Sequence, residues 1–166
     1  FKDIDNLYVA DGHHRTAAAE NYAVKMRKEV GDYTGQEEFN YYLAMIAPKN
    51  SLYVMDYNRV VEDLNGYDFD TFRNLLTKNF LIDQVDKAYK PREKYEYGMY
   101  IDGVWYRLKV KDEVIDTINK TSKNLAIDLL DVSLLHDLLI EPILGIDVPQ
   151  RDKRIDFIGG IRGLGE

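Results

Sequence analysis

The chain has 166 residues, 45% of them hydrophobic and 31% charged, a composition typical of a soluble globular protein of about one domain. It contains no cysteine, which excludes a disulfide framework and a thiolate nucleophile, and no uncharged apolar run long enough to span a membrane. The formal net charge of −7, from 22 basic and 29 acidic residues, disfavours a nucleic-acid partner, because DNA binding depends on a large positive surface. Without a signal-peptide pattern or cysteines, we expect a cytoplasmic protein that contacts no membrane.

The first part of the chain is predicted to alternate strands and a helix. An apolar run predicts a short strand over residues 7–10. Apolar residues at three- and four-residue spacing predict a helix from residue 15 or 16 to about residue 30, ended by Gly31. Two further apolar runs, at 41–47 and 52–58, are separated by a Pro-Lys-Asn-Ser turn and predict a hairpin.

The second part is predicted to contain helices, a second hairpin and a last strand. In chain order these are a helix capped by Asp68 or Asp70 and running to about Phe80, a hairpin turning at Asp102-Gly103, a short helix and loop over 111–124, a helix over 130–145 that stops near Pro142 or Gly145, and a strand over 154–160. Antiparallel pairs with interspersed helices predict an α+β fold with a mixed, mainly antiparallel sheet and flanking helices. Because the chain begins at Phe1 and ends in a glycine-rich segment, we expect a fragment of a longer protein.

The segment Asp-Gly-His-His-Arg-Thr, residues 11–16, is the strongest candidate for a functional site. A helix N-terminus carries about half a positive charge and unpaired amides, so each cation in the first turn costs about 0.3–1 kcal/mol. Here the residues at the predicted first turn are His13, His14 and Arg15, and a glycine precedes them. A bound phosphate or carboxylate would accept hydrogen bonds from the amides, be clamped by Arg15 and be contacted by the hydroxyl of Thr16.

Three other interpretations of this segment stay open from the residues alone. Asp11 can pair with Arg15, which leaves the histidines as surface residues. Asp11 and His13 can bind a metal ion, although adjacent histidines rarely reach one ion and no His-x-x-x-His spacing is present. A histidine, His13 or His14, can act as a general base oriented by Asp11, which is compatible with anion binding.

Two stretches of the chain resemble one family. "VADGHHRTAAA" (9–19) resembles the characteristic motif of DUF1015, a family of bacterial and archaeal proteins without an assigned function, and "LDVSLLHDLLIEPILGID" (130–147) is similar to a later stretch of the same family. Members of that family are much longer, which implies that N- and C-terminal portions lie outside this chain.

More distantly, Gly12-x-x-Arg15 followed by Ala18-Ala19 is similar to the Gly-Glu-Arg-Arg box of the ParB/sulfiredoxin superfamily. In that superfamily this loop and helix start hold nucleotide phosphates: CTP in ParB proteins, ATP in sulfiredoxin, and ADP in archaeal free-serine kinases. The resemblance implies that phosphate is bound by Gly12, His14 and Arg15, with Thr16 as a neighbour. It also implies that residues 1–35 are the end of an incomplete phosphate-binding unit. The pattern of strands and helices predicts that residues 36–166 form an α+β domain with two hairpins.

Two differences between this chain and that superfamily argue against two of the superfamily's functions. Sulfiredoxin chemistry needs a cysteine in the loop, and this chain has none. ParB proteins have an acidic residue where this chain has His13, and the acidic net charge disfavours DNA partitioning.

We therefore expect a nucleotide- and phosphate-binding protein of the DUF1015 type. One hypothesis is a small-molecule phosphotransferase, a kinase that uses ATP or ADP with Mg²⁺ and a hydroxylated acceptor. Asp11 would bind the metal, and Asp11, His13 and His14 are the candidate catalytic residues. The alternative is a non-catalytic module that responds to a nucleotide or another anion, and homo-oligomerisation is compatible with both.

His136-Asp137 resembles the His-Asp pair of metal-dependent phosphohydrolases in its residue types alone. Those enzymes need another histidine nearby, and the preceding one in this chain is His14. Because His136 lies among leucines, we expect a helix histidine rather than a metal ligand.

Overall fold

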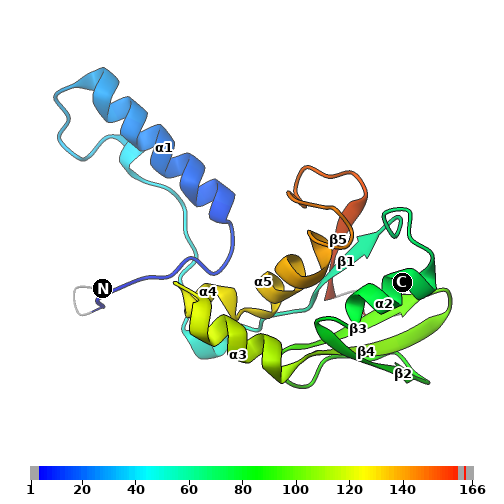
Figure 1. The fold of residues 1–166 in the computed structure, drawn as a ribbon. Coiled ribbons are helices and arrows are strands. Elements are labelled where there is room, and N and C mark those ends of the chain that lie inside the picture. Colours follow the sequence, from blue (N-terminus) through cyan, green and yellow to red (C-terminus); the bar gives the residue numbers. More distant parts are fainter. Residues whose placement is uncertain (1–3, 161–162, 164–166) are drawn as a thin grey trace. The chain divides into compact units, whose positions relative to one another are not determined.

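The computed structural model describes residues 4–160 and residue 163. The chain divides into two compact units, Phe1–Tyr53 and Val54–Glu166. Within the described residues it forms helices and two antiparallel sheets (Figure 1), so the predicted α+β class is confirmed. The boundary between the units lies later in the chain than the boundary predicted at residue 35. That residues 1–35 belong to a phosphate-binding unit stays a prediction.

The described residues of the first unit form one long helix and two short 3₁₀ turns. These are α1 (His13–Val30), η1 (Glu38–Asn40) and η2 (Lys49–Ser51). The helix begins at His13, earlier than predicted, and it ends at Gly31, whose φ of 77° confirms the predicted stop. The guanidinium Nε of Arg27 donates to Oδ1 of Asn40 at 2.8 Å, which joins α1 to η1.

The strands predicted in the first unit do not form. Residues 7–10 and 41–47 have no strand pairing, and the predicted hairpin over 41–58 is therefore wrong. An alternating apolar pattern describes side chains that suit a pleated surface, but a strand also needs a neighbour for its backbone N–H and C=O groups. Without that neighbour among the described residues, Leu43 is fully exposed (100%) and Met45 nearly so (92%).

The second unit contains a three-stranded antiparallel sheet in the order β2-β4-β3. Its strands are β2 (Phe80–Val85), β3 (Glu96–Ile101) and β4 (Val104–Val110). Asp102 and Gly103, with φ of 48° and 84°, form the predicted tight turn between β3 and β4. β2 was not predicted, because the helix that precedes it was expected to run to about Phe80.

A two-stranded antiparallel sheet pairs β1 (Tyr57–Val61) with β5 (Ile155–Gly159), which confirms the predicted last strand. The helical elements of this unit are α2 (Phe69–Leu76), α3 (Asp112–Thr121), α4 (Leu125–Asp128), α5 (Asp131–Leu135) and the π-helical turn η3 (His136–Ile140). The prediction of a helix that stops near Pro142 is confirmed, although its last turn is π-helical rather than α-helical. None of the helices that the structure describes has the length and apolar composition needed to cross a lipid bilayer.

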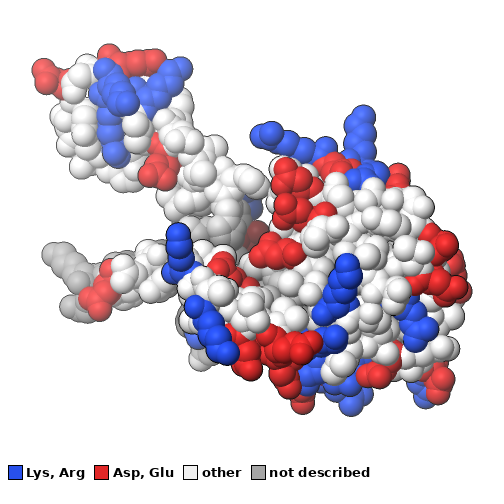
Figure 2. Space-filling view, in the orientation of Figure 1, with Lys and Arg blue, Asp and Glu red and all other residues white. Residues whose placement is uncertain are grey.

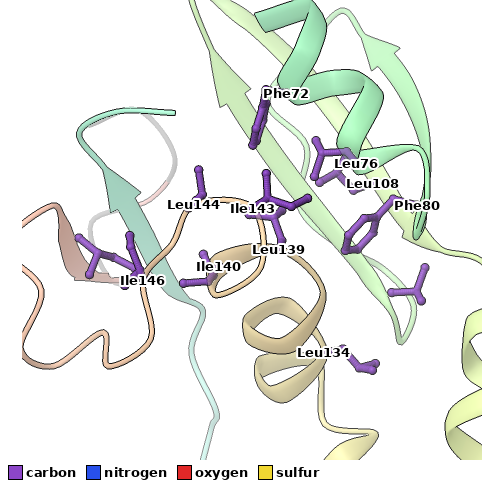
Figure 3. Close-up of a cluster of buried hydrophobic side chains, with 12 residues drawn as sticks. Phe72, Leu76, Phe80, Leu108, Leu134, Leu139, Ile140, Ile143, Leu144 and Ile146 are labelled. Carbon is purple, nitrogen blue, oxygen red and sulfur yellow. The ribbon is translucent and has the colours of Figure 1, made fainter. Parts of the chain in front are cut away.

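The core of the second unit lies between α2, the three-stranded sheet and the segment from α5 onward (Figure 3). The side chain of Asp68 accepts a hydrogen bond from the amide of Thr71 at 2.8 Å, and this cap confirms the predicted start of α2. The core side chains are Phe72, Leu76, Phe80, Leu108, Val110, Leu134, Leu139, Ile140, Ile143, Leu144, Ile146 and Ile155. On the face shown in Figure 2, acidic and basic side chains are interspersed over the surface of this unit.

One carboxylate is buried in this unit. Glu96 of β3 accepts hydrogen bonds from the hydroxyl of Tyr89 at 2.6 Å and from the guanidinium of Arg107. These bonds, led by that from Tyr89, lower the pKa of Glu96 from 4.5 to about 2. The loop that carries Tyr89 lies so close to β3 that a Cβ atom on Gly98 would be 2.2 Å from the carbonyl oxygen of Tyr89. Glycine is therefore the residue that allows this loop to approach the sheet.

Candidate functional site

The segment 11–16 forms the start of α1, and its backbone is shaped by a glycine. Gly12 precedes the helix with φ 74° and ψ 31°, in the left-handed region that favours glycine. The amide of Thr16 donates to the carbonyl oxygen of Gly12 at 2.9 Å, which is the first helical hydrogen bond. No side chain caps this end, so the amides of residues 13–15 keep their hydrogen-bonding capacity for another acceptor.

The side chain of Arg15 folds back toward Gly12. A Cβ atom built on Gly12 would lie 3.2 Å from Nη2 and 3.4 Å from Nε of Arg15. The guanidinium thus occupies the space that a side chain at position 12 would take. The glycine therefore has two roles, because it permits the left-handed backbone and leaves room for the cation.

The charges at this end of α1 are opposite to those that a helix N-terminus favours. The first turn contains no acidic residue, while the last turn carries Arg27 and Lys28, as the helix dipole favours. Asp11, His13, His14 and Arg15 are exposed, and Thr16 is half-buried. Among the ion pairs of the described residues, none joins Asp11 to Arg15. The described residues thus lack the Asp11–Arg15 pair of the surface interpretation, whereas the two histidines are surface residues, as that interpretation expects.

A metal site built on Asp11 and His13 gains no third ligand in the structure. Among the described residues, the group of His, Asp and Glu side chains close enough to share one ion is His136, Asp137 and Glu141. Asp11 as a ligand of a nucleotide's Mg²⁺ needs no such group, because Mg²⁺ is commonly held by one or two carboxylates, phosphates and water. The grouping of Glu141 with His136 was not predicted from the sequence, although Pro142 is a signal for the widened helical turn that creates it.

The turn thus combines a left-handed glycine, an uncapped helix start and an arginine that lies over that glycine. The family described as "Protein of unknown function (DUF1015)" matches residues 1–133. The chain belongs to the DUF1015 family. The search of curated proteins and the search of solved structures each gave no match. The DUF1015 match contains the whole 11–16 turn, and the likeness of this turn to the ParB/sulfiredoxin superfamily stays a prediction.

Proposed function

We propose that this DUF1015 protein binds the phosphate groups of a nucleotide, ATP or ADP with Mg²⁺, at residues 11–16. The observation that carries the proposal is the reversed charge pattern at the start of α1, where basic side chains follow a left-handed glycine and no acidic or capping side chain is present. A phosphate placed there accepts hydrogen bonds from the free amides and neutralises the cations that would otherwise oppose the helix dipole. The same position without an anion is electrostatically unfavourable.

Each residue of the turn has a distinct part in this proposal. Arg15 binds phosphate oxygens through its guanidinium, which can donate two parallel hydrogen bonds. His14 adds a ring N–H donor, and the hydroxyl of Thr16 adds another. Gly12 leaves the space in which the guanidinium of Arg15 lies, next to the amides of residues 13–15. Asp11 binds the Mg²⁺ that bridges phosphate oxygens.

We further propose that the bound nucleotide donates a phosphoryl group to a small hydroxylated metabolite. In such a transfer the protein contributes mainly positioning and charge stabilisation, for which Arg15 and Mg²⁺ are suited. A histidine of the turn, His13 or His14, would accept the proton of the acceptor hydroxyl. The transfer step is supported by the resemblance of the turn to that of the archaeal free-serine kinases. Within this chain, it is supported by the residue types of the turn.

Calorimetric titration of the protein with ATP, ADP, CTP and inorganic phosphate, each with and without Mg²⁺, tests the binding step. We expect Arg15→Ala to weaken nucleotide binding by about 10–100-fold, since charge-assisted hydrogen bonds contribute about 1.5–3 kcal/mol. Lys28→Ala is the matched control, because it removes an exposed cation from the other end of the same helix. Equal loss in both variants would show general charge attraction instead of a site.

Phosphorus NMR of the protein with ATP or ADP, Mg²⁺ and a panel of hydroxylated metabolites tests the transfer step. A phosphorylated acceptor whose formation depends on Arg15 supports the kinase. Binding that depends on Arg15 without any transfer supports the alternative function, a nucleotide-responsive binding module. If none of the nucleotides and no phosphate binds, both functions are wrong.

A further inference from the structure

The third histidine of the chain lies in a wide helical turn that follows α5. In the π-helical turn η3, the amide of Glu141 donates to the carbonyl oxygen of His136, five residues earlier, at 3.0 Å. In an α-helix of about 3.6 residues per turn, side chains five positions apart point in different directions, whereas a π turn brings them to one side. The turn therefore places Glu141 beside His136.

Pro142 gives a physical reason for the widened turn. Proline has no N–H group, and in an α-helix its ring clashes with the carbonyl four residues earlier, here that of Leu138. The two amides that follow Pro142, those of Ile143 and Leu144, both donate to the carbonyl oxygen of Leu139, at 3.1 and 3.2 Å. The shape of the turn thus follows from the sequence and requires no ligand to create it.

Three side chains with metal-binding atoms meet on this turn: His136, Asp137 and Glu141. One such atom from each residue lies within 4.8 Å of the other two, and Nε2 of His136 is 3.7 Å from Oε2 of Glu141. In a tetrahedral Zn²⁺ site, two ligand atoms that each lie about 2.0–2.2 Å from the ion are about 3.3–3.6 Å apart. Small side-chain rotations therefore bring all three atoms to coordinating distance.

The backbone of this cluster is anchored in the core, while its two carboxylates are exposed to solvent. Leu134, Leu139 and Ile140 are buried in the core on either side of His136 in the sequence (Figure 3). His136 is half-buried, whereas Asp137 and Glu141 are exposed. In the part of the chain that the structure describes, the imidazole of His136 makes no hydrogen bond, and Glu141 is its ion-pair partner. A backbone fixed by the core holds the three side chains near one another before an ion binds.

We propose that His136, Asp137 and Glu141 bind one divalent first-row transition ion, with Zn²⁺ bound more tightly than Mn²⁺. The imidazole nitrogen favours Zn²⁺, and carboxylate oxygens suit both ions. Mg²⁺ and Ca²⁺ prefer oxygen ligands throughout, so this set binds them more weakly. Three protein ligands leave at least one coordination position for water or an anionic group, as in catalytic zinc sites. The site differs from the sequence-based interpretation of His136 as a packing residue, and it is independent of the phosphate turn.

Calorimetric titration of the full chain with ZnCl₂, MnCl₂ and MgCl₂ tests the site, with Co²⁺ absorption as a second readout of nitrogen and oxygen coordination. We expect one Zn²⁺ per chain. Both His136→Gln and Glu141→Gln should weaken Zn²⁺ binding at least about 10-fold, since even the loss of a ligand's outer partner costs about 10–100-fold. Glu62→Gln is the matched control, because Glu62 is exposed and its side chain makes no hydrogen bond or ion pair among the described residues. Circular dichroism of each variant verifies that the helices are retained.

The double variant His13→Gln/His14→Gln locates the ion, because the chain has only these two other histidines. Loss of Zn²⁺ binding in that variant alone would place the ion at the phosphate turn and overturn the proposal. Three other results would also overturn it: no saturable binding to the native chain, equal affinities of Glu141→Gln and Glu62→Gln, or Mg²⁺ binding as tight as Zn²⁺ binding. None of these results bears on nucleotide binding by Arg15.

Discussion

The two units of this protein differ in how much of their own apolar surface they bury. Of the buried hydrophobic residues in the described part of the chain, Ala23 alone belongs to the first unit, and all others belong to the second. The first unit instead exposes a run of large apolar side chains: Tyr41, Tyr42, Leu43, Met45, Ile46, Leu52 and Tyr53. Apolar content is therefore a poor guide to where a core forms.

The hydrophobic core and the candidate phosphate site lie in different units. The second unit has a closed core between a helix, a sheet and the segment from α5 onward, and hydrophobic burial of this kind is the dominant stabilising contribution in folding. The first unit has a helix whose start carries unfavourable charges and whose contacts to the rest of that unit include a side-chain bond from Arg27 to Asn40. We therefore expect substitutions in the first unit to change ligand binding, and those in the second to change global stability.

A pair of identical substitutions, one in each unit, should show the largest contrast. Leu76→Ala removes a side chain that is 0% exposed, and we expect it to lower the free energy of unfolding by about 2–5 kcal/mol. Leu43→Ala, at a fully exposed position, should change it by less than about 0.5 kcal/mol. Urea unfolding followed by far-ultraviolet circular dichroism, which reports the helices of both units, measures both changes. The fluorescence of Trp105, the single tryptophan and part of β4, reports the second unit. Comparable losses would mean that Leu43 is buried in the folded protein in solution.

Acid should destabilise the second unit through Glu96, with a somewhat smaller effect. Because the folded state lowers its pKa from 4.5 to about 2, the ionised carboxylate contributes fully above about pH 4.5, and this contribution is lost as the pH falls toward 2. Hydrogen bonds to charged groups contribute about 1.5–3 kcal/mol, and we expect a loss of this order. Urea unfolding at several pH values should show this slope in the native protein and not in Glu96→Gln.

Glu37 of the first unit provides the control for this pH effect. Hydrogen bonds led by that from the backbone amide of Thr34 also lower its pKa to about 2. Protonation of Glu37 between about pH 4.5 and 2 should therefore loosen the turn that contains Thr34, without affecting the fluorescence of Trp105. A Glu37→Gln variant that lost the acid slope of Trp105 would contradict the separation of the two units.

The smallest expected effect tests the charge pattern of α1. His14→Glu places an acidic residue in the first turn, so it should stabilise the helix by about 0.3–1 kcal/mol while it abolishes phosphate binding. Amide hydrogen exchange across α1 measures the first change, and calorimetric titration with nucleotide measures the second. Lys28→Glu in the last turn should have the opposite effect on the helix and leave phosphate binding unchanged. If His14→Glu made the helix less stable, the electrostatic argument for an anion would be wrong.

Sequence patterns predicted the elements whose signals are local. Asp68 before an apolar stripe identified the start of α2, and Asp102-Gly103 identified the β3–β4 turn, because each depends on a few neighbouring residues. β2 was missed because it pairs with β4, which is distant in sequence, and because Asp83 interrupts its apolar run. The hairpin predicted over 41–58 was wrong because alternation does not reveal whether a partner strand exists.

The candidate phosphate turn was predicted in its residues but not in its geometry. The sequence alone placed the 11–16 segment at a helix start, and the structure adds the left-handed Gly12 and the position of Arg15 over it. Those two features depend on backbone angles and a side-chain rotamer, which composition does not determine. The grouping of His136 with Glu141 was not predicted, because α-helical spacing separates them and only a π turn joins them.

Gly98 has a consequence for which sequence changes this fold tolerates. Gly98 is itself exposed, a position in a strand where many side chains are usually accepted. Any side chain there must displace the backbone of Tyr89 and with it the hydroxyl that binds Glu96. Loss of the Tyr89 hydroxyl would leave the buried carboxylate of Glu96 with fewer hydrogen-bond donors. A substitution at Gly98 would therefore destabilise an ionised group two positions away. We expect a mutational scan of β3 to show the lowest tolerance of substitution at Gly98, although glycine has no side chain that could make an interaction.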